Sequence, residues 1–206
     1  ARSLNVTGYA EFTNNSNYEQ DQVNLQYSQY ITQTVFVENR VRQMIHANLD
    51  QIEEGKEVDN KDVVNRFLGL AGSKVSSWCG DREEFLGRYH GYGNPTGVET
   101  GELNNHGNYN ENGCGAITTT IELAPGESRT IAFIVGMIDN KEAGKIVNLY
   151  ADTKAVCDRE LEELITYWHG QLSHFQIKTP SDEFNTMINT WNAYNCFMTF
   201  IWSRAA

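Results

Sequence analysis

The sequence predicts a mainly β protein: an antiparallel β-sandwich followed by two α-helices. Three observations indicate this fold class. Apolar and polar residues alternate along most of residues 1–138, as they do in strands that bury one face. Charged and glycine-rich stretches interrupt the alternation, which is typical of connections between strands. After residue 138 the apolar spacing becomes that of amphipathic helices. We therefore expect a β-sandwich over residues 1–140 and a helical region over residues 141–206.

The first expected strand covers residues 3–12, and its apolar face carries Leu4, Val6, Gly8, Ala10 and Phe12. Because this alternation is under way at residue 3 and residue 1 is Ala, we interpret the chain as beginning within a larger fold. Further strands are expected at residues 23–37, 41–49, 63–70 and 72–79, with a helical turn at Asp81–Leu86. Residues 117–138 are expected to form a hairpin whose second strand, apolar on both faces, lies centrally in a sheet.

The connection from Gly87 to Gly115 is rich in glycine, and we expect an irregular loop there. Long structured loops often carry functional residues. Tyrosines in and before this loop suit a carbohydrate, since aromatic rings stack on sugar rings and nearby amides bond hydroxyls. They are Tyr18, Tyr27, Tyr30, Tyr89, Tyr92 and Tyr109. Each of them taken singly is equally well explained as ordinary protein surface.

Two helices are expected in the last third of the chain. Residues 155–172 place their apolar side chains on one stripe and acidic residues opposite. A second helix begins at Thr179–Glu183, where hydroxyls, a proline and two acids suit a helix N-terminus. It runs to the end of the chain and carries aromatic residues around its circumference. Too few residues remain to cover them, so we interpret the chain as part of a larger protein.

Charge and composition exclude several classes of partner. The 206 residues carry 27 acidic and 16 basic side chains, a formal net charge of -11, without a cluster of Lys or Arg. Nucleic acids and anionic membranes would be repelled, and no apolar run reaches the ~18 residues of a membrane span. No CxxC pair occurs among the four cysteines, which indicates reduced thiols and a cytoplasmic location. They are Cys79, Cys114, Cys157 and Cys196.

Few residues suggest catalysis or metal binding. The adjacent carboxylates Glu83–Glu84 and Glu162–Glu163 lie on expected helices, where solvated charge explains them better than paired acid chemistry. His169 and His174 are spaced five residues apart, which does not suit a helical metal site. The common nucleotide-binding and hydrolase motifs are missing from the sequence. These residues therefore predict no catalytic residue, no metal and no cofactor.

Several stretches match motifs of one known family. The longest, Asn185–Phe200, reads N-T-M-I-N-T-W-N-A-Y-N-C-F-M-T-F against a family pattern N-x-M-v-N-x-W-N-x-Y-Q-C-M-v-T-F. The others are Tyr9–Phe12, Asn17–Tyr18, Asp81–Tyr89, Leu123–Glu127, Tyr167–Trp168 and Ser203–Arg204. With these motifs the chain resembles, along nearly its whole length, the disaccharide phosphorylases of glycoside hydrolase family 94, typified by cellobiose phosphorylase.

The resemblance implies a galactose-mutarotase-like super-sandwich joined by two linker helices to an (α/α)6 catalytic barrel. It also implies inverting phosphorolysis of a β-glucoside such as cellobiose or a cellodextrin. Inorganic phosphate, a substrate rather than a cofactor, attacks the anomeric carbon while an aspartic acid protonates the leaving oxygen, giving α-glucose 1-phosphate. That acid and the phosphate ligands would lie in the barrel, so this fragment alone is expected to be inactive.

In the family, the sandwich supplies a loop to the rim of the active site, often across a homodimer interface. By position in the motif, Asn17, Tyr18 and Gln20 are the expected sugar contacts, and Arg204 is expected to anchor the linker to the barrel. The chain departs from the family pattern at Asn17–Gln22 and at Asn195, which leaves the sugar, the linkage and the dimer geometry open. A stand-alone carbohydrate-binding sandwich and a structural domain are the alternative interpretations.

Overall fold

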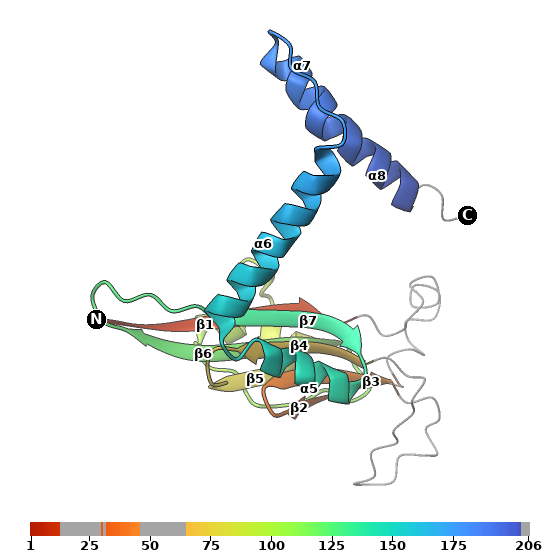
Figure 1. Ribbon diagram of the computed structural model, residues 1–206. Coiled ribbons are helices and arrows are strands. Elements are labelled where there is room, and N and C mark those ends of the chain that lie inside the picture. Colours follow the sequence, from red (N-terminus) through yellow and green to blue (C-terminus); the bar gives the residue numbers. More distant parts are fainter. Residues whose placement is uncertain (13–29, 31, 46–64, 203–206) are drawn as a thin grey trace. The chain divides into compact units, whose positions relative to one another are not determined.

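The computed structural model describes residues 1–12, 30, 32–45 and 65–202 (Figure 1). Its contacts divide the chain into two compact units, Ala1–Lys154 and Ala155–Ala206. The first unit holds two antiparallel sheets with short helices, and the described part of the second is helical. The predicted antiparallel β-sandwich followed by helices is thus confirmed.

One sheet of the sandwich has three described strands, in the order β1–β6–β5. Their bounds are β1 Arg2–Glu11, β5 Ser77–Asp81 and β6 Gly113–Leu123. In the register of β1 with β6, Gly8 lies opposite Ile117. The strand predicted for residues 3–12 is therefore present; Ala10 and Phe12 pack in the core between the sheets, whereas Leu4, on the same predicted face, is 37% exposed.

The other sheet has four described strands, in the order β2–β3–β4–β7. Their bounds are β2 Thr32–Val37, β3 Arg40–Ile45, β4 Asn65–Ala71 and β7 Ala132–Ile138. A tight turn at Glu38 and Asn39 joins β2 to β3, and Glu38 has a positive φ of 56°. The core between the two sheets is built on Val41, Leu70 and Ile117, each fully buried. Burial of each such side chain stabilises the fold by about 1.5–3 kcal/mol.

Helices cover the outer face of each sheet. Helix α5 (Asn140–Leu149) packs Ala143 and Val147 against Phe67 of β4. The buried side chain of Arg40 holds the start of this helix, since its Nη2 donates to Asn140 Oδ1 at 2.8 Å. The other sheet is covered by the segment from residue 82 to residue 112, named here the covering segment, which includes α3 (Arg82–Leu86) and α4 (Thr96–Glu99).

The covering segment closes one side of the sandwich. The Gly80 N–H donates to His106 O at 2.8 Å, and the Thr34 N–H donates to Asn108 O at 2.9 Å. The same segment thereby bonds to β5 in one sheet and to β2 in the other. On the opposite side, β1 and β7 approach each other where the Phe133 ring lies against Gly8. Within the described residues, each of these two strands pairs with a single neighbour.

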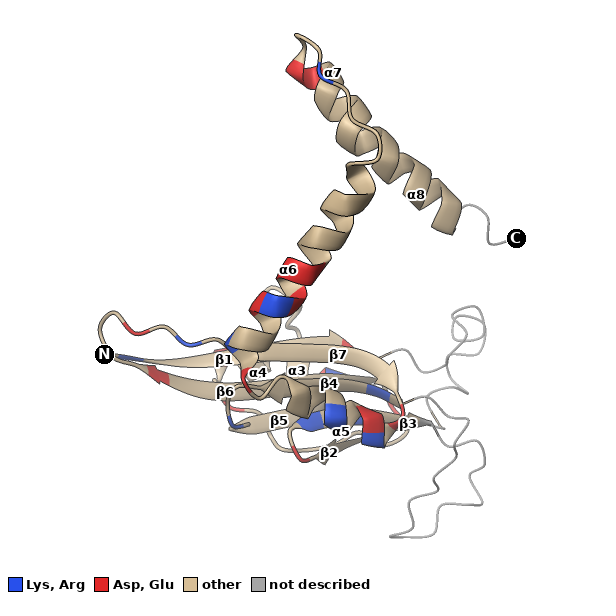
Figure 2. Cartoon of the chain, viewed as in Figure 1, with Lys and Arg blue, Asp and Glu red and all other residues tan. Residues whose placement is uncertain are grey.

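The second unit is built from α6 (Thr153–Leu172), α7 (Asp182–Thr186), a π-helical turn η2 (Met187–Asn192) and α8 (Ala193–Trp202). The two predicted helices are confirmed, and Ser181 caps the second by accepting from the Phe184 N–H. The Trp168 ring meets Phe197 edge-on at 5.1 Å between centroids. Helix α8 carries no charged residue (Figure 2). None of the described helices is both long enough and apolar enough to cross a membrane.

Some sequence predictions were wrong. Residues 117–138 do not form a hairpin, because β6 and β7 belong to different sheets and the connection between them crosses from one to the other. The region Gly87–Gly115 is not wholly irregular, since it contains α4 and the start of β6. The predicted strand at 72–79 is shifted to β5, and helix α5 was not predicted. The hairpin error has a physical reason, since the apolar spacing of a strand does not reveal which sheet it joins.

Candidate functional site

The end of β1 carries a polar cluster centred on one carboxylate. Glu11 Oε1 accepts three hydrogen bonds: from Tyr92 Oη at 2.5 Å, from Tyr9 Oη at 2.8 Å and from Arg82 Nε at 2.8 Å. Arg82 Nη2 also donates to Tyr92 Oη at 2.9 Å, and its guanidinium lies 5.7 Å from the centre of that ring. We call these four residues the Glu11 cluster.

Local structure brings the members of the Glu11 cluster together. Asp81 caps helix α3 by accepting from the Glu84 N–H at 2.9 Å, which fixes Arg82 as the first residue of the helix. One turn later Phe85 is buried, and the Tyr9 ring stacks on it at 4.4 Å between centroids. The helix therefore holds Arg82 beside β1. Two of the motifs quoted above, which are far apart in the sequence, meet at the bond between Glu11 and Arg82.

The cluster shifts the pKa values of its members. Partial burial opposes ionisation of Glu11, but the hydrogen bonds from Tyr92, Arg82 and Tyr9 outweigh it and lower the pKa of Glu11 below its ordinary value. Burial, followed by the bond to Glu11, raises the pKa of Tyr9, and the bonds to Tyr92 and Glu11 raise the pKa of Arg82. Glu11 is thus an ionised acceptor at neutral pH. A general acid needs the opposite shift, so this carboxylate organises structure.

The loop after α3 presents a strained aromatic residue to solvent. Gly87 ends the helix with a φ of 84°, and Tyr89 follows with a φ of 64° and a fully exposed side chain. The loop is fixed by His90, whose Nδ1 bonds to Asn94 O at 2.8 Å, and by Tyr92 in the Glu11 cluster. A positive φ is unfavourable for a tyrosine, and strain of this kind concentrates at functional positions. Tyr89 therefore combines an exposed ring with a strained backbone, which makes it a candidate for ligand contact.

The adjacent carboxylates Glu83 and Glu84 of the covering segment each have their own partners. Glu83 accepts from Arg82 Nη1 at 2.6 Å, whereas Glu84 bonds to Asn104 and, at 3.1 Å, to His106 Nδ1. Glu83 and Glu84 therefore do not form a facing pair of the kind that glycoside hydrolysis requires.

All four cysteines are free thiols. Within the part of the chain that the structure describes, no three His, Cys, Asp or Glu residues are grouped as metal ligands.

The expected sugar contacts Asn17, Tyr18 and Gln20, and also Arg204, lie outside the described residues. Of the tyrosines singled out in the sequence, Tyr18 and Tyr27 lie outside them as well. The others, Tyr30, Tyr89, Tyr92 and Tyr109, are all exposed, and Tyr92 joins the Glu11 cluster. The bond between Glu11 and Arg82 was not predicted, although both residues stand in motifs quoted above.

Asparagine side chains organise the start of the last helix. Asn189 Oδ1 accepts from the Ile177 N–H and its Nδ2 donates to Ile177 O, both at 2.9 Å. One turn earlier, Asn185 bonds in the same way to the N–H and carbonyl of Thr179, at 2.8 Å and 2.9 Å. Each side-chain amide bonds to the backbone N–H and carbonyl of one residue of this segment, as a neighbouring strand would in a sheet. We call this arrangement the amide clasp; it gives a structural role to two asparagines of the longest family motif, Asn185 and Asn189.

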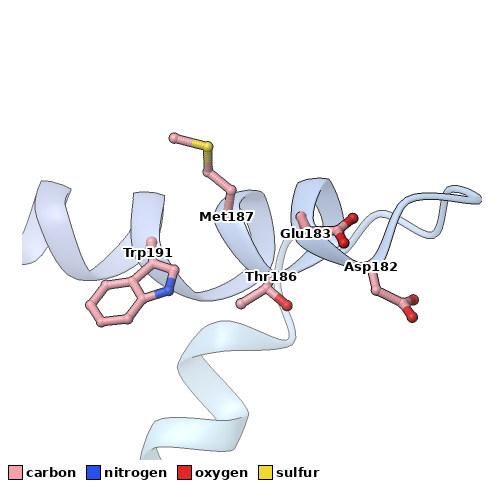
Figure 3. A pocket seen from close by; sticks show the side chains of 5 residues that line it. All are labelled: Asp182, Glu183, Thr186, Met187 and Trp191. Atoms are coloured by element: carbon pink, nitrogen blue, oxygen red, sulfur yellow. The ribbon is translucent and has the colours of Figure 1, made fainter.

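A shallow depression lies on the same helix, lined by Asp182, Glu183, Thr186, Met187 and Trp191. Figure 3 shows that these side chains do not converge, since Met187 and Trp191 project to different sides of the helix. All five residues are exposed. A small-molecule site normally encloses its ligand among convergent groups, so the depression does not have the form of a binding pocket.

Comparison with known proteins agrees with the motifs. Residues 1–153 match the family model of the glycosyl hydrolase 94 supersandwich domain. The chain belongs to the glycosyl hydrolase 94 family. Residues 167–206 match a second model, that of the catalytic domain of the glycosyl hydrolase 94 superfamily. The Glu11 cluster therefore lies in the family's supersandwich domain, and the amide clasp lies in the part matched to its catalytic domain.

Relatives in the glycosyl hydrolase 94 family include N,N'-diacetylchitobiose phosphorylase of Vibrio proteolyticus, 28% identical over 206 residues. A second is 3-O-beta-D-glucopyranosyl-beta-D-glucuronide phosphorylase of Paenibacillus borealis, 33% identical over 115 residues, 55% of this chain and 14% of that protein. A third is cyclic beta-(1,2)-glucan synthase of Rhizobium meliloti (strain 1021), 30% identical over 135 residues, 64% of this chain and 5% of that protein. The first match covers 100% of this chain but 24% of the relative, so the chain spans about a quarter of that enzyme's length.

Proposed function

We propose that the chain is part of an inverting disaccharide phosphorylase. The observation that carries this proposal is the match of one chain to the supersandwich model and then to the catalytic-domain model of a single family. Two of the relatives quoted above bear the name phosphorylase. In the proposed reaction a phosphate oxygen bonds to the anomeric carbon as the glycosidic C–O bond breaks, and an aspartic acid outside this chain protonates the leaving oxygen.

In this proposal the sandwich serves the active site without performing the chemistry. Asn17, Tyr18 and Gln20 contact the sugar at the rim, as expected from the motif, and the loop carrying Tyr89 contributes a ring at the same rim. The Glu11 cluster supports this role because it fixes the loop to the end of β1, directly before the connection that holds Asn17. The helical region 141–206 leads into the catalytic barrel, and two copies associate as a homodimer. The protein acts in the cytoplasm without a cofactor.

The substrate class is a β-linked disaccharide. The sequence motifs favour a β-glucoside such as cellobiose or a cellodextrin. The name of the Vibrio proteolyticus relative instead specifies N,N'-diacetylchitobiose, and the name of the Paenibacillus borealis relative specifies a glucosyl glucuronide. A substrate panel has to include all three sugar types, because the described residues hold no contact that selects among them.

The test uses the intact polypeptide with inorganic phosphate and a panel of cellobiose, cellotriose, N,N'-diacetylchitobiose and 3-O-β-glucosyl glucuronide. Phosphorus NMR follows the products. We expect the α-anomer of a sugar 1-phosphate from one class of disaccharide. A β-anomer would contradict inversion, and absence of any sugar phosphate with every substrate would contradict phosphorolysis. Binding of these sugars without turnover would favour the alternative, a stand-alone carbohydrate-binding sandwich.

The rim assignment has its own test. Tyr18→Ala and Tyr89→Ala in the intact enzyme should each raise KM for the disaccharide about 5- to 30-fold, since loss of one aromatic contact removes about 1–2 kcal/mol. Val98→Ala is the control, because Val98 is a half-exposed side chain on α4 of the sandwich to which no sugar contact is assigned. Unchanged KM in the Tyr18 and Tyr89 variants would remove the rim from the proposal and leave the phosphorylase assignment untouched.

A further inference from the structure

The loop of residues 88–94, between α3 and α4, is bonded to the sheet by one side chain. Tyr92 Oη donates to Glu11 Oε1 at 2.5 Å, and Glu11 lies on β1, 81 residues away in the sequence. Among the described residues, the hydrogen bonds of the other loop residues stay within the loop or reach back to Gly87. His90 also lies 3.5 Å from a carboxylate of α4. The position of the loop against β1 therefore depends on the Tyr92 hydroxyl.

The Tyr92 hydroxyl bridges an ion pair. Arg82 Nε lies 2.8 Å from Glu11 Oε1, and Arg82 Nη2 donates to Tyr92 Oη at 2.9 Å. The hydroxyl thus accepts from the cation and donates to the anion, and hydrogen bonds to charged groups are stronger than those between neutral groups. Tyr92 is 63% exposed, so burial contributes little to holding its ring. The two bonds of the hydroxyl are therefore the main support of this part of the loop.

The loop backbone has little support on either side of Tyr92. Gly91 and Gly93 precede and follow it, and beyond the chain neighbours no atom lies within 4 Å of where a Cβ would stand at either glycine. Glycine in open space allows the backbone many conformations. Tyr89, three residues before Tyr92, has the strained φ of 64°. Release of the Tyr92 hydroxyl would therefore free the loop, and Tyr89 with it, to leave this conformation.

We propose that Tyr92 is a positioning residue, which holds the Tyr89 ring in place for sugar contact without touching the sugar itself. This inference rests on the proposed function, in which Tyr89 contributes an aromatic contact at the rim. A loop that is already held in its binding conformation loses less conformational freedom when the sugar binds, so affinity is gained without a new contact. Arg82 acts one step further away, by orienting the Tyr92 hydroxyl.

The test is a double-mutant cycle in the intact polypeptide, with Tyr92→Phe, Tyr89→Ala and both changes together. Tyr92→Phe keeps the ring and removes only the hydroxyl. It should raise KM for the disaccharide about 3- to 10-fold, the cost of ordering a released loop, and leave kcat unchanged. In the Tyr89→Ala background the same change should leave KM unaltered, because the ring that Tyr92 positions is already absent.

The matched control is Glu83→Gln. Glu83 also accepts from Arg82, at 2.6 Å, but it belongs to α3 and not to loop 88–94. Loss of this exposed ion pair should change KM by less than about 2-fold. An equal rise of KM for Tyr92→Phe in both backgrounds would overturn the proposal, since Tyr92 would then act without Tyr89. An unchanged KM for Tyr92→Phe alone would overturn it as well.

Hydrogen exchange gives a second measure, which needs no substrate. Tyr92→Phe should accelerate exchange of the amides of residues 88–94 about 5-fold, because one hydrogen bond that opposes opening of the loop is lost. Unchanged exchange would show that the hydroxyl does not hold the loop and would overturn the proposal. Failure of the proposed function is seen separately, as absence of sugar phosphate with the unsubstituted polypeptide. In that case the same cycle is measured as Kd for each sugar of the panel, with the same criteria.

Discussion

The sandwich and the helical unit use their apolar residues in opposite ways. In the sandwich, side chains such as Val41, Leu70 and Ile117 are fully buried between the sheets. In the described part of the helical unit, from residue 155 to residue 202, no residue is buried. Trp191 and Trp202 are 55% and 76% exposed, on helices that carry hardly any charge to keep them in water (Figure 2).

This difference indicates where each unit obtains its stability. The sandwich has a buried core within residues 1–154, and we expect most of its folding free energy to arise there. The helices have local support from capping and from the amide clasp, but isolated helices gain most of their stability from packing of an apolar face. An apolar surface of this extent on a soluble domain is normally covered by a partner. In the proposed enzyme that partner is the rest of the catalytic barrel.

The largest expected effect is in the core of the sandwich. Phe67→Ala should reduce the free energy of unfolding by about 3–5 kcal/mol. The ring of this β4 residue is 1% exposed and packs against residues of β7 and α5. Urea unfolding followed by circular dichroism measures the change. Leu149→Ala is the control, since Leu149 is 68% exposed and should cost less than about 0.5 kcal/mol. Similar losses for both variants would mean that the sandwich does not carry its own core.

The next largest effect tests whether the aromatic residues of the helical unit are covered in the longer protein. Trp202→Ala should cost less than about 0.5 kcal/mol in the chain 1–206, where this side chain is 76% exposed. In the intact polypeptide the same change should cost about 2–4 kcal/mol, because the barrel would bury the indole. Thermal unfolding of the two proteins measures both values. An equally small cost in each would show that nothing covers this helix in the longer protein.

The amide clasp should contribute a smaller, local effect. Asn189→Ala removes both bonds to Ile177, whose backbone N–H and carbonyl are then left without those partners, at a cost of about 1–2 kcal/mol. Hydrogen exchange at the Ile177 amide should accelerate about 5- to 30-fold, and exchange in the sandwich should not change. Asn195→Ala, at an exposed position of α8, is the matched control. Unchanged exchange at Ile177 would show that the clasp does not hold the segment.

The sequence predicted the fold class well where alternation or helical spacing was unbroken. Residues 3–12 and 155–172 are examples, since the spacing of their apolar side chains alone predicts strand β1 and helix α6. Prediction failed where the partner of a strand had to be known. The turn at Ala124–Glu127 looks like a hairpin turn, but the core needs β6 and β7 in opposite sheets. Sequence spacing cannot distinguish the two arrangements.

The candidate site was predicted only in part, for the same reason. The motifs containing Glu11 and Arg82 were both found, yet the bond between them depends on the packing of Phe85 against Tyr9. Asn17, Tyr18 and Gln20 were inferred from the family motif alone and remain predictions. The strain at Tyr89 could not be predicted either, because a positive φ at a tyrosine is imposed by the surrounding structure.

The Glu11 cluster should make the stability of the sandwich depend on pH. The pKa of Glu11 is lowered in the folded state from an ordinary value of 4.5, so its contribution is present above that pH and is lost as the pH falls through the folded pKa. Glu11→Gln should therefore cost about 1 kcal/mol at pH 7 and progressively less below pH 4.5. Urea unfolding between pH 7 and about pH 3 measures the difference.

The matched control for this pH dependence is Glu122→Gln, because Glu122 is an exposed carboxylate on β6. This variant should change stability by less than about 0.5 kcal/mol at every pH. If the difference in the free energy of unfolding between wild type and Glu11→Gln grew as the pH fell, its sign would be wrong for a lowered pKa of Glu11. It would show that the three donors do not stabilise the ionised carboxylate.

The smallest expected effect concerns the strained loop. Tyr89→Gly should stabilise the sandwich by about 0.5–1 kcal/mol, because glycine adopts the φ of 64° without the steric cost that a Cβ brings, although part of the gain is lost to backbone entropy. Tyr89→Ala keeps the Cβ and should give no such gain. Both variants remove the ring and should weaken sugar binding equally in the proposed enzyme. Equal stability of the two variants would show that the backbone at Tyr89 is not strained. A gain for Tyr89→Gly alone would show that the loop holds this residue in an unfavourable backbone conformation, with its aromatic ring exposed.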